Sequence, residues 1–167
     1  RETPYHPAHS TAIAGLADIM GGDDRFYNNL LVGKGEAAAG YGLRVYDQCE
    51  FPLQTGGNVY CHGAQPGTRE TNAVNLAGVD PHVRLVEEGR QVFLQFGWRP
   101  EMRNPQTTLV TTRLLGKARI PRLAYENPDG SPLKVDRDYF GQRRNTVHPL
   151  SGPFECWAEK ELRLKVW

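Results

Sequence analysis

The stretch YHPAHSTAIAGLADIMGGDDRFYNNLLVG, residues 5–33, decides the fold of this chain. It joins a histidine-rich segment, a glycine turn and a short aromatic strand that ends in two adjacent asparagines. Asparagine favours turns because its amide hydrogen-bonds the nearby backbone. Asn28 and Asn29 therefore predict a turn directly after the strand. The spacing of the residues favours two interpretations equally. One is an ordinary asparagine turn, and the other is a turn whose amides hydrogen-bond along a stack of strands.

Short candidate strands alternate with glycine-rich loops before residue 75. Each is too short to form an independent sheet, so each is expected to supply one rung to a stack of coils. The candidate strands are TAIAGL (11–16), DDRFYNNLLVG (23–33), GLRVYD (42–47) and GNVYCHG (57–63). The residues expected to face inward are Phe26, Val45 and Val59.

The pattern of short strands and glycine-rich loops ends near NLAGVDPHV at 75–83, and longer, hairpin-like strands follow. We therefore place a boundary between residues 1–75 and 76–167. HVRLVEEGRQVFLQF (82–96) predicts an antiparallel hairpin, because apolar residues alternate on both sides of a Glu-Glu-Gly turn. Further strands are expected at 108–116, 124–136 and 162–167, roughly enough for a small β-sandwich. EAAAG at 36–40 could form at most one helical turn.

Composition narrows the functional class. The 167 residues carry 20 basic and 19 acidic side chains, a net charge of +1, and this interleaved pattern argues against a nucleic-acid partner. No apolar run approaches the about 20 residues that span a bilayer, so no membrane partner is expected. Three cysteines without a CxxC pair favour reduced thiols, and hence a cytoplasmic location, although a targeting segment could lie upstream.

Several phrases together resemble the carboxy-terminal portion of glycoside hydrolase family 120, the β-xylosidase family. They are YHPAHSTAIAGL, GGDDRFYNNLLVG, GNVYCHGAQP (57–66), LAYENPDGSPLKVDRDYFG (123–141) and LRLKVW (162–167). The resemblance runs across nearly the whole chain. It implies an all-β fold in which residues 1–75 form the final coils of a right-handed parallel β-helix and residues 76–167 form a small antiparallel β-sandwich.

The resemblance also implies an activity: release of xylose from the non-reducing end of xylo-oligosaccharides with retention of configuration. Retention requires two carboxyl groups about 5–5.5 Å apart. In the family these lie upstream of the YHxxHST segment, so no catalytic residue is expected in this chain. The implied partners are the xylo-oligosaccharide and an upstream β-helix segment, as a separate chain or a missing covalent part, with a homo-oligomer left open. No cofactor is implied.

The acidic residues of this chain are not assigned as the nucleophile. Asp23 and Asp24 are adjacent, and neighbouring strand residues point to opposite faces, so both carboxylates cannot easily address one sugar carbon. Turn capping and a salt link to Arg25 are the roles expected for this pair. Asp47 is not assigned as the nucleophile either.

His6 and His9 are the candidate substrate-binding residues, since imidazoles hydrogen-bond sugar hydroxyls and the segment follows the family's catalytic coils. The competing interpretation is structural, with both side chains satisfying buried backbone groups in a loop stiffened by proline. No metal site is expected, because His6, His9 and His62 lack a fourth ligand and a zinc spacing. Ala12 stands where the family usually has a glutamate after HST, which leaves the specificity in doubt.

Two other functions stay open. A noncatalytic carbohydrate-binding module would stack a sugar on Trp98 or Trp157, although core or interface packing is the favoured role for Trp98, Trp157 and Trp167. Another β-helix glycosidase or a polysaccharide lyase would share only the scaffold. The products separate these classes, since a lyase leaves an unsaturated sugar that absorbs ultraviolet light.

Overall fold

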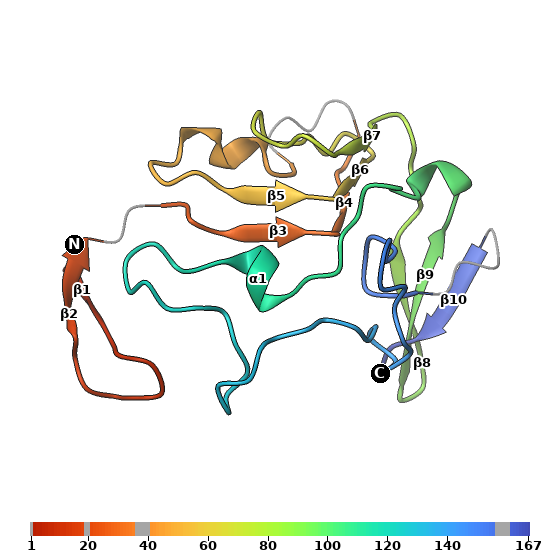
Figure 1. Ribbon diagram of the computed structural model, residues 1–167. Helices are drawn as coiled ribbons and strands as arrows, with labels where there is room; N and C mark the ends of the chain where they lie inside the picture. The colour runs from red at the N-terminus through yellow and green to blue at the C-terminus, as the bar shows by residue number, and fades with distance from the viewer. Residues whose placement is uncertain (1, 19–20, 36–40, 156–160) are drawn as a thin grey trace.

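The computed structural model describes residues 2–18, 21–35, 41–155 and 161–167. Strands dominate this part of the chain and helix is scarce, as an all-β fold requires. Figure 1 shows three regions side by side: an antiparallel hairpin at one end, parallel strands in the middle and an antiparallel sheet at the other end.

Two of the parallel strand pairs share an offset of 29 residues. Strand β3 (Arg25–Tyr27) pairs with β5 (Gln54–Gly56), and β4 (Leu30–Val32) pairs with β6 (Val59–Cys61). A single bridge joins Gly22 to Phe51 in the same register. Strand β7 (Val74–Leu76) adds to β6 after a shorter return of 15 residues. Two successive turns of the chain therefore lie one above the other.

The most buried strand is β6, and it is covered on both faces. Tyr60 packs with Leu43 and Ala64 on one face, and the half-buried Phe26 and Leu31 join this cluster. On the other face, side chains of β4, β7 and the 3₁₀ helix η2 (Pro100–Met102) cover Val59 and Cys61. The inward position expected for Val59 is confirmed, and Phe26 packs on the core as expected.

Two expected rungs are wrong. TAIAGL (11–16) runs into β2 (Gly15–Asp18), which pairs antiparallel with β1 (Glu2–Tyr5) instead of joining the stack. GLRVYD (42–47) makes one parallel bridge at Gly42 and then turns into the 3₁₀ helix η1 (Arg44–Gln48). Val45 therefore lies on a helical turn and is 55% exposed, so its predicted inward position is also wrong.

The predicted hairpin at 82–96 and the predicted last strand are confirmed. Strands β8 (Arg84–Glu88), β9 (Gln91–Gly97) and β10 (Glu161–Lys165) form one antiparallel sheet with β9 in the centre. Its buried side packs Phe96 and Leu162 against Phe154. Among the described residues this is the one multistranded sheet of the carboxy-terminal half.

The strand expected at 108–116 is a short helix, α1 (Thr112–Leu115). Thr111 has extended backbone and its hydroxyl accepts a hydrogen bond from the Leu114 N–H at 3.3 Å, so a helix cap overrides the strand preference of a threonine pair. Segment 124–136 makes only single bridges. The helical turn expected at 36–40 lies outside the described residues. No helix within the described ranges has the length and apolar character needed to cross a membrane.

Candidate functional site

The loop between β1 and β2 carries both candidate substrate-binding histidines, and both are exposed. His6 Nδ1 lies 2.9 Å from the Ala12 carbonyl oxygen, so this nitrogen donates and closes the loop. His9 Nε2 lies 2.9 Å from Glu126 Oε1. Each imidazole therefore keeps one ring nitrogen for an added hydrogen bond.

Glu126 is the partner that sequence reasoning missed. It is 117 residues from His9, and no sequence signal links a glutamate before a Pro-Asp-Gly turn to a histidine near the start of the chain. The side chains of His9 and Glu126 are 48% and 30% exposed. The nearby Ser131 hydroxyl and N–H bind Asp129 and hold its pKa below the usual range, which keeps a second negative charge beside the loop.

Asp23 is a structural acceptor with both carboxylate oxygens in use. Oδ1 lies 2.6 Å from the guanidinium of Arg25, which is the salt link expected from the sequence. Oδ2 accepts the backbone N–H of Arg119 at 2.7 Å. Asp47 is also bound, since its Oδ1 accepts the backbone N–H of Thr68 at 2.8 Å. Both oxygens of Asp23 are therefore bound within the fold, and Asp47 is bound through Oδ1.

Arg25 connects the first coil to the segment after α1. Its guanidinium donates to the Leu115 carbonyl at 3.0 Å and to the Lys117 carbonyl at 2.8 Å, and it lies over the Tyr125 ring at 4.8 Å. The side chain is only 5% exposed. Together with Asp23, this arginine holds segment 111–125 against β3.

Asn29, in the turn after β3, hydrogen-bonds an asparagine of the next coil. Of the two interpretations that the sequence left open, this is the one in which amides bond along the stack, and we call it the asparagine ladder. Asn58, 29 residues beyond Asn29, accepts hydrogen bonds from the Asn29 N–H at 2.8 Å and from the Asn29 amide at 3.0 Å. The Asn58 amide donates to the Phe26 carbonyl at 2.8 Å and to Glu70 at 2.9 Å. Glu70 also accepts from the Tyr60 hydroxyl, and burial together with this carboxylate raises the pKa of Tyr60. The turns of successive coils are thus fixed to each other by amide side chains.

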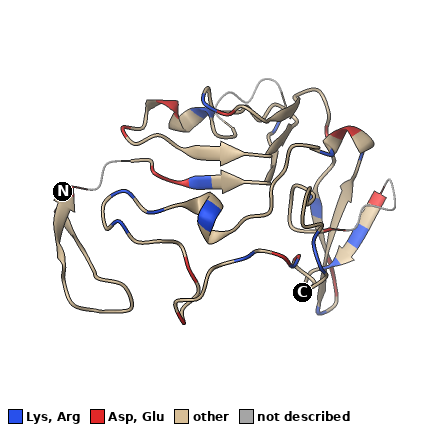
Figure 2. Cartoon of the chain, in the orientation of Figure 1, with Lys and Arg blue, Asp and Glu red and all other residues tan. Residues whose placement is uncertain are grey.

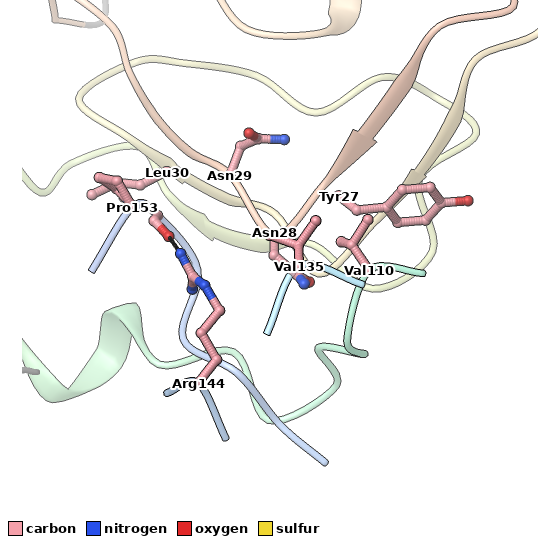
Figure 3. Close-up of a pocket in the computed structure, with 9 residues that line it drawn as sticks. Tyr27, Asn28, Asn29, Leu30, Val110, Val135, Arg144 and Pro153 are labelled. Carbon is pink, nitrogen blue, oxygen red and sulfur yellow. Dashed lines mark hydrogen bonds between the residues drawn. The ribbon is translucent and has the colours of Figure 1, made fainter. Parts of the chain in front are cut away.

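A cavity of about 290 Å³ opens between the β3–β4 turn and the carboxy-terminal segments (Figure 3). Its lining mixes polar and apolar side chains, from Tyr27 to Leu30 on one side and from Val110, Val135, Arg144 and Pro153 on the other. The guanidinium of Arg144 donates to the carbonyls of Leu150 and Gly152 at 3.1 and 2.9 Å. Because its charged group is bound to backbone, this cavity offers a ligand few free hydrogen-bonding groups.

His62 lies far along the chain from the histidine loop and has a different partner. Its Nδ1 is 3.5 Å from the Asp80 carboxylate. The same carboxylate lies 3.0 Å from Nδ1 of His82. The His82 backbone N–H donates to Asp80 at 2.7 Å and holds the pKa of Asp80 below its usual range. Within the described ranges, no three His, Cys, Asp or Glu side chains converge as metal ligands.

The tryptophans separate into different environments. Trp98 packs against two buried clusters, as core packing predicts. Trp167 is 83% exposed at the last position of the chain. Trp157 lies outside the described residues. Figure 2 shows basic and acidic residues interleaved along the described ribbon, which agrees with the even charge balance of the sequence.

Comparison with known proteins finds one whole-length structural likeness. No protein-family model matches the chain, and no curated protein matches it. A solved structure described as the complex structure of XylC with xylose matches with a TM-score of 0.90 and 30% sequence identity. The match covers 100% of this chain and 30% of that chain. The chain therefore spans under a third of the length of the protein it resembles.

Proposed function

We propose that this chain is part of a retaining β-xylosidase of glycoside hydrolase family 120, which releases xylose from the non-reducing ends of xylo-oligosaccharides. The single observation that supports the proposal is the whole-length likeness to XylC, a protein described in complex with xylose. It agrees with the YHxxHST and GGDDRFYNN phrases, which resemble that family independently of the structure.

The two catalytic carboxyl groups are proposed to lie on polypeptide outside this chain. Several carboxylates of the described residues already have structural partners: Asp23 binds Arg25, Glu70 binds Asn58, and Glu155 accepts the N–H groups of Asn145 and Leu150. A nucleophile or an acid needs a carboxyl group that reaches the sugar. Tying these groups into the fold removes them from that role.

The upstream polypeptide is proposed to stack on β3 and β4 as a further coil. Both are edge strands among the described sheets. The backbone on either side of β3 hydrogen-bonds β5. The Asp24 carbonyl accepts the Gln54 N–H at 3.0 Å, and the Asn28 N–H donates to the Gly56 carbonyl at 2.9 Å. The alternate residues of β3 face away from β5, where no described strand pairs with them. Within residues 1–75, the part that follows the β1–β2 hairpin would then supply the last coils of a right-handed parallel β-helix, and 76–167 the sandwich-like region.

His6 and His9 are proposed to contact the substrate from the β1–β2 loop. Both are exposed, and each keeps one ring nitrogen available after its contact with Ala12 or Glu126. Because Glu126 holds Nε2 of His9, we assign Nδ1 as the nitrogen that meets a sugar hydroxyl. The Ala12 methyl offers no acid function at the position where the family has glutamate.

A noncatalytic carbohydrate-binding module is the second candidate function. The observation that favours it is Trp167, an aromatic side chain with 83% exposure that could stack on a sugar ring. This module would bind xylo-oligosaccharides without hydrolysing them, even beside an upstream chain.

The test is hydrolysis of xylobiose followed by proton NMR, using preparations of the source protein that contain this chain. The proposal predicts release of β-xylose first, before mutarotation. Release of α-xylose first would contradict retention, and an unsaturated product would assign the chain to a lyase. Binding without hydrolysis in every such preparation would favour the carbohydrate-binding module.

A further inference from the structure

A second cavity, of about 240 Å³, lies on the side of Tyr27 that faces segment 104–114. Tyr27, Asn28 and Gly56 line it from the first two coils, and Asn72, Gln106 and Thr108 line it from the loops. None of the side chains that line it carries a charge. None of them belongs to the β1–β2 loop, so this cavity is separate from the site proposed for His6 and His9.

The loops around this cavity are held by two asparagine amides, one of them buried. Asn104 is 3% exposed, and its amide donates to the Asn72 carbonyl at 2.6 Å while its oxygen accepts the Gln106 N–H at 2.9 Å. Asn28 donates to the Thr108 carbonyl at 2.8 Å. The backbone of three loop residues is therefore fixed before any ligand arrives, which lowers the entropy lost on binding.

Four side chains on the cavity wall have free hydrogen-bonding groups. The amides of Asn72 and Gln106 and the hydroxyls of Tyr27 and Thr108 make no hydrogen bond to any other residue in the described part of the chain. Amides both donate and accept, as sugar hydroxyls do. The wall therefore matches a ligand covered in hydroxyl groups.

The floor of the cavity is a glycine beside an aromatic ring. A Cβ atom at Gly56 would lie 3.4 Å from the Tyr27 ring, so the ring packs against this glycine and a larger side chain here would crowd the ring and the cavity. Figure 3 shows the Tyr27 ring extending away from Asn29 and Arg144, with its hydroxyl on the far side from the arginine. A tyrosine ring offers an apolar face together with a polar edge, which suits a sugar ring.

We propose that this cavity binds one neutral sugar unit. A charged ligand would lose its hydration without meeting an opposite charge on the wall, which disfavours it. The fixed amides, the free hydroxyls and the tyrosine ring together recognise an uncharged polyhydroxylated ring. The proposal rests on the cavity and not on hydrolysis, so it applies equally to a xylosidase segment and to a binding module.

The test is ligand-observed NMR of the full 167-residue chain with xylose as the neutral probe and glucuronate as the charged one. Replacing both amides, Asn72→Ala with Gln106→Ala, is expected to weaken xylose binding by about tenfold, since each lost hydrogen bond is modest. Both side chains are exposed and unpaired, so the fold is expected to persist. Gln142→Ala, an exposed glutamine elsewhere, is the matched control.

The proposal expects xylose binding to survive in the Gln142→Ala variant and glucuronate to give no signal. A second variant, Gly56→Val, narrows the cavity and is expected to reduce binding without removing a polar group. Absence of xylose binding to the unmodified chain would overturn the proposal. So would unchanged binding in the double variant, or binding lost only in His9→Ala, which would locate the sugar at the histidine loop. Xylobiose hydrolysis is scored separately, so the xylosidase proposal can fail while this one holds.

Discussion

Asn58 is fully buried, and its side-chain amide hydrogen-bonds Asn29 and the Phe26 carbonyl of the preceding coil together with Glu70 in the loop after β6. A buried amide without partners costs far more than an exposed one, so each hydrogen bond here has to be made. Asn29 above it and Glu70 beside it complete the set. At the scale of residues, this amide explains why the coils keep their 29-residue register.

Replacing Asn58 by leucine is expected to lower the free energy of unfolding by about 2–4 kcal/mol, because Glu70, Asn29 and the Phe26 carbonyl lose their partner. Urea unfolding followed by circular dichroism measures the change. Asn75→Ala, an exposed asparagine on β7, is the control and should stay within about 0.5 kcal/mol. Equal effects of the two substitutions would contradict the ladder.

The Cys61 thiol makes the stability fall at high pH. Burial, with a smaller contribution from Asp80, raises its pKa from 9.0 to about 11. Between these values the unfolded thiol loses its proton while the folded thiol keeps it, so stability decreases as pH rises. Over this window Cys61 accounts for a loss of about 3 kcal/mol. In Cys61→Ala the fall should be shallower by that amount, whereas parallel curves would show that this thiol does not titrate differently on folding.

Sequence reasoning at the residue scale identified the asparagine turn and the salt link of Asp23 to Arg25, because both depend on near neighbours. It placed Val45 inward from strand spacing alone and was wrong. The contact between His9 and Glu126 joins residues 117 positions apart, and no local pattern encodes such a pair. The histidine roles themselves stay a prediction.

Elements far apart in the sequence are held together by Arg25. This side chain of β3 donates to the carbonyl of Leu115, the last residue of α1, to the Lys117 carbonyl and to Asp23, and little of it reaches solvent. The structure therefore depends on the pair Asp23–Arg25 to attach segment 111–125 to the parallel strands.

Substituting Arg25 by methionine keeps much of the apolar stem but removes the guanidinium, leaving the partly buried Asp23 carboxylate without its cationic partner and with only the Arg119 N–H. A loss of about 3–5 kcal/mol in unfolding free energy is expected. Hydrogen exchange should accelerate at the Arg119 N–H, which donates to the same carboxylate. Arg90→Met, on an exposed turn, is the control. Unchanged exchange at the Arg119 N–H would show that the Asp23–Arg25 pair does not hold segment 111–125.

Elements were predictable where a repeat or an alternation spans the whole strand. The hairpin at 82–96 and the strand near the end follow the period of two that a half-buried strand requires. The threonine pair before α1 reads as strand by propensity, but a hydroxyl cap decides the outcome locally. The β1–β2 hairpin was missed because its pairing depends on tertiary context and not on the apolar pattern of TAIAGL.

At the scale of the whole molecule, β3 and β4 are edge strands, since each pairs on one side only among the strands that the structure describes. The 167-residue chain by itself is expected to self-associate, because unpaired strand edges recruit other strands. Light scattering should show mass rising with protein concentration, and exchange at the amides of Arg25 and Tyr27 should slow in parallel. Amides of β8, at the edge of the other sheet, provide the internal comparison. A monomer at every concentration would contradict the open-edge account.

The most direct test of the central claim is size-exclusion chromatography of the source preparation, with intact mass and 4-nitrophenyl β-xyloside turnover measured on every fraction. The account predicts that turnover coelutes with this chain only where additional polypeptide supplies the catalytic carboxyl groups. A soluble, inactive 18.7 kDa species in all fractions, with no larger active form containing this sequence, would contradict it.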